Sequence, residues 1–147
     1  MPSIAGFIDW DGAIVAVRVG VSQNRRERLK SVGFTIPAEI PLRLQLDTGS
    51  HLTGFPRTVF KALEITPFDE IPISTPSTKP GEACKAFLFD VSLTLAAPDG
   101  HTRTFASVHA IASDDFNANV NSILGRNVLD ECDFFWRGPD KTFYLEF

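Results

Sequence analysis

The sequence predicts an all-β protein with one or two short helices. Several segments alternate apolar and polar residues with the two-residue period of a half-buried strand, and no segment shows a long helical period. The chain also contains 13 phenylalanines and 10 prolines, a composition that favours strands and loops. With 147 residues the chain is long enough to bury a core. We therefore expect a single domain over residues 1–147.

The first two predicted strands flank a basic insertion. Residues 13–21 and 36–47 both alternate, and each buries one face. These faces carry Val15, Val17, Val19 and Val21, and then Ile40, Leu42, Leu44 and Leu46. Between the strands, residues 23–34 contain four cations, Arg25, Arg26, Arg28 and Lys30. We interpret the insertion as a solvated loop or one helical turn, with a binding patch as the alternative.

The remaining elements follow in order. Residues 55–65 predict a short helix with Pro56 in its first turn. Residues 71–95 predict a hairpin with a turn-rich tip, residues 97–100 a turn and residues 102–112 a strand. Residues 113–121 are polar and predict a loop. The C-terminal segment predicts a hairpin whose last strand has Phe143, Leu145 and Phe147 on one face. That face either closes its own domain or contributes to a subunit interface.

The most informative motif is Asp47-Thr48-Gly49-Ser50, which directly follows the second alternating strand. It places one carboxylate in a tight turn at a strand end. A β-turn without function is the alternative interpretation, since all four residue types are common in turns. Two carboxylates that share one proton can activate a water and polarise a peptide carbonyl, one acting as base and the other as acid. The motif occurs once, so that chemistry needs a second chain.

A second motif, Ile123-Leu124-Gly125-Arg126-Asn127, follows far downstream. Together the two motifs resemble the retropepsin-like (retroviral-type) aspartic protease family. The segment 55–65, which predicts a short helix, resembles the corresponding segment in the cellular and bacterial branch of that family. The resemblance implies a single-lobe acid protease barrel that acts as a homodimer, with a short helix over residues 126–132.

The resemblance also implies roles for the motif residues. Asp47 would be the catalytic carboxylate. Thr48 would brace the two catalytic loops, Gly49 would allow the close backbone approach, and Ser50 would sit beside the carboxylates. Ile123, Leu124 and Gly125 would pack under the catalytic turn and fix it, and Arg126 would complete this second signature. In the viral enzymes this arginine pairs with an acid, and here His51 stands at that position.

The hairpin over residues 71–95 is the candidate flap. A flap would fold over a cleft, exclude water and hold an extended peptide by main-chain hydrogen bonds. The residues expected to contact the substrate are Thr75, Pro76, Ser77 and Thr78. A surface hairpin without a gating role is the alternative.

The resemblance implies an aspartic endopeptidase whose substrate is a protein or peptide. The alternative is a catalytically weak or inactive peptide-binding or assembly module with the same fold. A net charge of −4 gives no reason to expect nucleic acid as a partner. No segment has the apolar length of a membrane span, and the start of the sequence lacks a secretory signal pattern. Cys84 and Cys132 do not form a disulfide framework, and we expect a cytoplasmic protein without metal or cofactor.

Overall fold

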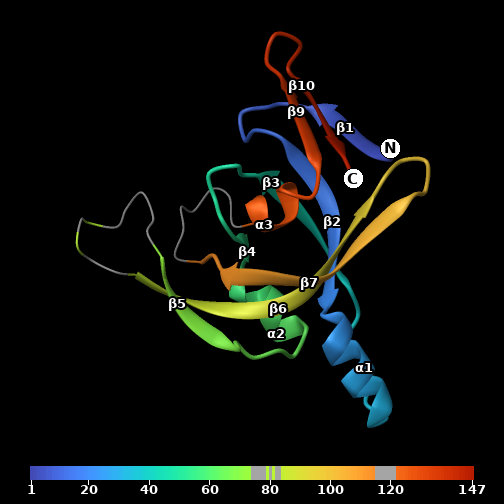
Figure 1. Cartoon of the computed structure of the whole chain (residues 1–147), viewed down its shortest axis with the longest axis vertical. Coiled ribbons are helices and arrows are strands. Elements are labelled where there is room, and N and C mark those ends of the chain that lie inside the picture. The colour runs from blue at the N-terminus through green and yellow to red at the C-terminus, as the bar shows by residue number, and fades with distance from the viewer. Residues whose placement is uncertain (74–78, 80, 82–83, 115–121) are drawn as a thin grey trace.

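The computed structural model describes residues 1–73, 79, 81, 84–114 and 122–147. Strands dominate it (Figure 1). The strands are β1 (Ser3–Phe7), β2 (Ile14–Val21), β3 (Ile40–Leu46), β4 (Thr53–Phe55), β5 (Asp69–Ile73), β6 (Cys84–Ala96), β7 (Thr102–Ala112), β8 (Ile123–Leu124), β9 (Asp133–Arg137) and β10 (Thr142–Glu146). The helices are α1 (Gln23–Ser31), α2 (Arg57–Ala62) and α3 (Arg126–Leu129). The predicted all-β class with short helices is therefore confirmed.

The main sheet closes on itself. Its seven strands run in the order β2-β3-β8-β4-β7-β6-β5, and β2 also pairs with β6. One edge of β6 is divided between two partners, with β5 along residues 84–88 and β2 along residues 91–95. A barrel results, and β5 extends beyond it as an outer strand. Most pairs are antiparallel, but β3 and β8 run parallel, as do β4 and β7.

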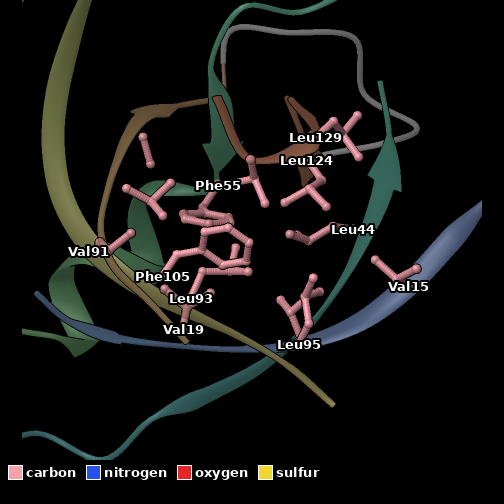
Figure 2. Packing of buried hydrophobic residues seen from close by; sticks show 14 of the residues in the cluster. Val15, Val19, Leu44, Phe55, Val91, Leu93, Leu95, Phe105, Leu124 and Leu129 are labelled. Carbon is pink, nitrogen blue, oxygen red and sulfur yellow. The ribbon is translucent and has the colours of Figure 1, made fainter. Parts of the chain in front are cut away.

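The core fills the barrel with the residues that the alternation predicted (Figure 2). The four valines of β2 are buried, as are Leu44 and Leu46 of β3. In α2, Val59 and Phe60 point into the core, and the Phe60 ring stacks on Phe89 with centroids 3.8 Å apart. Burying such side chains stabilises a protein by about 1.5–3 kcal/mol each. The short helix predicted at residues 55–65 is confirmed.

The N- and C-terminal strands form a second, three-stranded sheet at one end of the molecule, in the order β1-β10-β9 (Figure 1, top). The C-terminal hairpin is as predicted, but β1 was not expected from the sequence. Phe143, Leu145 and Phe147 are all buried in the chain's own core. This face of the hairpin therefore closes its own domain. The opposite face leaves Phe135 and Tyr144 partly exposed.

The basic insertion is the clearest departure from expectation, because it forms the nine-residue helix α1 and not a loop or one turn. Both ends are capped. The Ser22 hydroxyl accepts from the Arg25 N–H, and Gly33 adopts φ +75°, a left-handed conformation suited to glycine. The Phe34 N–H bonds the Leu29 carbonyl at 2.9 Å and the Gly33 N–H the Lys30 carbonyl at 3.2 Å. This is the Schellman pattern, which ends a helix.

Candidate functional site

The turn that carries Asp47 begins where β3 ends. The Asp47 N–H donates to the Leu124 carbonyl at 3.0 Å, so β8 holds the backbone of the aspartate. The Ser50 N–H then donates back to the Asp47 carbonyl at 3.2 Å and closes the turn. The chain leaves the turn toward β4. Both the N–H and the carbonyl of Asp47 therefore form backbone hydrogen bonds.

The Asp47 carboxylate is half-buried and oriented by the glycine that follows. The Gly49 N–H donates to Oδ1 at 2.9 Å. A Cβ at position 49 would lie 3.2 Å from that oxygen, which is tighter than ordinary contact. Among the described residues, no donor contacts the second oxygen, Oδ2. The turn thus fixes one oxygen of the Asp47 carboxylate through the Gly49 N–H.

The other two residues of the motif lie in different surroundings. The Ser50 hydroxyl donates to the Leu52 carbonyl at 2.6 Å, and the Ser50 carbonyl accepts from the Arg126 N–H at 2.9 Å. Ser50 thus ties the turn both to its own continuation and to the start of α3. Thr48 is exposed at the tip of the turn.

Gly125 packs directly against the segment that leaves the turn. A Cβ at this position would lie 2.3 Å from the Leu52 carbonyl oxygen and 2.9 Å from the Thr53 nitrogen. Both neighbours are backbone atoms, which cannot rotate away as a flexible side chain would. Only glycine fits, and this is the physical reason for the glycine of the second motif.

A buried polar network joins the two motifs, and its centre, Thr53, could not be identified from the sequence. The Thr53 hydroxyl donates to Asn127 Oδ1 at 2.9 Å and accepts from the Gly125 N–H at 3.1 Å. The Asn127 side chain also accepts from the Thr53 N–H and donates to the His109 carbonyl. Three segments, β4, β7 and α3, are bound through this one amide. Asn127 could have been suspected from the motif, whereas a threonine inside a short strand is unremarkable in sequence.

Arg126 extends toward His51, the residue that follows the Asp47 turn. Its Nη2 lies 2.8 Å from both ring nitrogens of His51. The lone pairs of the two nitrogens diverge, so only one of them accepts at a time. Arg126 Nε is buried without a hydrogen-bond partner among the described residues. Arg126 therefore joins the start of α3 to the residue that follows the Asp47 turn.

A small apolar cluster connects the turn to the hairpin of β5 and β6. Ala86, Leu88 and Ile111 are buried together, and Leu52, Ile71 and Ile73 pack against them. Leu52 comes two residues after Ser50, so the segment beyond the turn and the base of the hairpin share one apolar surface. Ala86 and Leu88 lie on the face of β6 opposite to Phe89, so β6 packs on both of its faces.

The hairpin predicted over residues 71–95 is formed by β5 and β6. Its expected substrate-contacting residues, Thr75, Pro76, Ser77 and Thr78, lie outside the described residues. Over the described ranges no group of three or more His, Cys, Asp or Glu side chains could hold a metal ion. In the same ranges, no helix has the length and apolarity needed to cross a membrane.

Comparison with solved structures defines the fold. The chain is similar to the crystal structure of a retropepsin-like aspartic protease from Rickettsia conorii, with a TM-score of 0.58 and 13% sequence identity. The alignment covers 99% of this chain and 90% of that one. No protein-family model matches the sequence, and no curated protein matches it either. The chain thus has the fold of the retropepsin-like aspartic proteases.

Proposed function

We propose that the protein is an aspartic endopeptidase that hydrolyses peptide bonds with one Asp47 from each of two chains. The observation that carries this proposal is the Asp47 carboxylate itself, held by the Gly49 N–H at a turn of the retropepsin-like fold. One carboxylate of the pair, ionised, would take a proton from water, and the other, protonated, would donate to the substrate carbonyl. Closely spaced carboxylates share one proton, because both cannot ionise.

The proposed assembly is a two-fold homodimer in which the Asp47 turns meet. One chain supplies one such turn, and an isologous contact would bring the two copies together. Thr48 is exposed at the tip of the turn, where it would bond the facing loop. The contacts of Gly125 and Arg126 with the segment from Ser50 to Thr53 would keep the turn rigid.

The proposed substrate is an extended peptide that lies beside the hairpin of β5 and β6. In the part of the chain that the structure describes, β5 is an outer strand that pairs along one edge with β6, and its other edge has no strand partner there. The apolar side chains of Leu52, Ile71 and Leu88 lie at the base of this hairpin. We therefore expect apolar side chains in the substrate near the cleaved bond.

The test is hydrolysis of a peptide library, read by mass spectrometry, for the parent and for Asp47→Asn. The variant keeps the side-chain shape but removes the acid/base group, so cleavage should be abolished while folding is retained. Asp133→Asn, at an exposed aspartate in β9, is the matched control and should cleave like the parent. Undiminished cleavage by Asp47→Asn would refute the mechanism. A well-folded parent that binds peptides without cutting them would identify the alternative, a binding or assembly module.

Assembly is tested in the same assay by dilution. Activity per chain should fall below the dimer dissociation constant, as mass action requires. Analytical ultracentrifugation over the same concentrations gives the oligomeric state. A stable monomer with full specific activity would exclude the shared site.

A further inference from the structure

The helix α1 takes no part in the core or in the candidate site. None of its residues is buried, and it extends away from the barrel at the end opposite to the terminal sheet (Figure 1, lower right). A helix without a buried face gains little from packing against the core. The body of the protein holds it at its first turn, where Arg25 Nη2 donates to the Glu64 carbonyl at 3.1 Å.

The charge of α1 is opposite to that of the whole chain. Four cations, Arg25, Arg26, Arg28 and Lys30, stand against the single acid Glu27 and give the helix a net charge of +3. The net charge of the chain is −4, so the rest of the protein carries −7. In the described part of the chain none of the four cations forms an ion pair. Arg25 contacts the Glu64 carbonyl and Arg26 is half-buried, whereas Arg28 and Lys30 are exposed and present their charge to the solvent.

Two apolar side chains stand beside these cations. Val32 is 61% exposed and Phe34 is 68% exposed, both just after the helix ends. The Schellman bonds from Gly33 and Phe34 fix this segment against the last helical turn. Cations with adjacent exposed apolar side chains are the composition of segments that bind anionic lipid surfaces, where cations contact headgroups and apolar groups enter the acyl boundary. A nucleic acid would use the cations but would gain nothing from Val32.

We propose that α1 and the segment 32–34 form a docking surface for a bilayer that contains anionic lipid. The contact is peripheral. Because α1 lies at the end of the molecule opposite to the terminal sheet, docking through α1 leaves that sheet away from the bilayer (Figure 1). The proposal is independent of the proposed protease activity, and Asp47→Asn should bind lipid like the parent.

The test is co-flotation of the full chain with vesicles of phosphatidylglycerol and phosphatidylcholine, and with vesicles of phosphatidylcholine alone. At low ionic strength the chain should float with the anionic vesicles only, and 0.5 M salt should release it. Each cation near an anionic surface contributes about a fivefold change in partitioning. Arg28→Gln with Lys30→Gln should thus weaken binding about 25-fold, and Phe34→Ser about tenfold.

The matched control is Arg43→Gln with Lys141→Gln, which removes two exposed cations from other surfaces of the chain. It should bind anionic vesicles like the parent. All these positions are exposed, so circular dichroism and the melting temperature should be unchanged. No binding to anionic vesicles at low salt would overturn the proposal, as would an equal loss in the control pair. Binding to duplex DNA that needs Arg28 and Lys30, with no binding to vesicles, would also overturn it.

Discussion

Gly125→Ala should destabilise the whole protein, because the added methyl group would clash with the backbone of Leu52 and Thr53. The Cβ would lie 2.3 Å from the Leu52 carbonyl oxygen and 2.4 Å from its carbon. To accommodate it, β4 and the start of α3 must separate. Separation also lengthens the 3.1 Å bond from the Gly125 N–H to the Thr53 hydroxyl, which is buried.

The magnitude follows from these two effects. Overpacking costs about 2 kcal/mol at a tightly packed site, and a buried donor left without its partner costs about 1 kcal/mol or more. The free energy of unfolding should therefore fall by about 3 kcal/mol. For a chain of this length that corresponds to a melting temperature lower by about 6–12 °C.

Urea denaturation and thermal melting measure this directly. Gly138→Ala is the control, because its Cβ would meet only Trp136 side-chain atoms at 3.7 Å or more. It should change the free energy of unfolding by no more than about 0.5 kcal/mol. A Gly125→Ala protein that melts within about 2 °C of the parent would refute the assigned contact. If the protein is the protease proposed above, the same variant should lose activity at a lower temperature than the parent, because the contact of Gly125 with Leu52 supports the segment that follows Asp47.

Three further results are expected. Thr53→Val should lower the free energy of unfolding in urea by about 2 kcal/mol, because it leaves the Gly125 N–H unpaired, whereas Thr53→Ser keeps the hydroxyl and should recover most of that loss. Burial raises the pKa of the Cys132 thiol, so a smaller fraction of the thiol is present as the reactive thiolate at a given pH. Iodoacetamide at pH 8 should therefore modify Cys132 more slowly in the folded protein than in the urea-unfolded protein. Equal modification rates, measured by peptide mapping, would contradict this expectation. If two Asp47 carboxylates share a proton, the rate of peptide cleavage plotted against pH should be a bell-shaped curve with an acidic to mildly acidic optimum. A rate that does not depend on pH, or activity that is lost when a metal chelator is added, would count against the pair of carboxylates.

The strands could be predicted from the sequence because burial of one face imposes alternation. Val15 to Val21 and Leu42 to Leu46 follow that rule and lie where it places them. The rule is less informative in β6, where Ala86 and Leu88 are buried on one side and Phe89 and Val91 on the other. This strand serves two clusters, and its pairing with β7 shifts register between Val91 and Leu93.

The elements that were not predicted correctly from the sequence also have physical explanations. Helix α1 has no apolar face, so periodicity could not reveal it; its signals were the capping residues Ser22 and Gly33. Strand β1 is short and is stabilised by β10, which lies at the other end of the sequence. The second motif could be found by its apolar pair and glycine. The network through Thr53 and Asn127 could not, because it depends on contacts between residues more than 70 positions apart.

Because β3 pairs with β8, which lies far downstream in the sequence, the Asp47 turn gains its support late in the synthesis and folding of the chain. The backbone of Asp47 is bonded to Leu124, and Ser50 to Arg126. These partners are translated more than 70 residues after the aspartate, and bringing such distant segments together is a slow step of folding. A growing chain that has just exposed Asp47 to the solvent lacks the strand that supports it. The aspartate turn can therefore gain these bonds only after Leu124 and Arg126 have been synthesised, and shorter nascent chains contain the motif without its structural support.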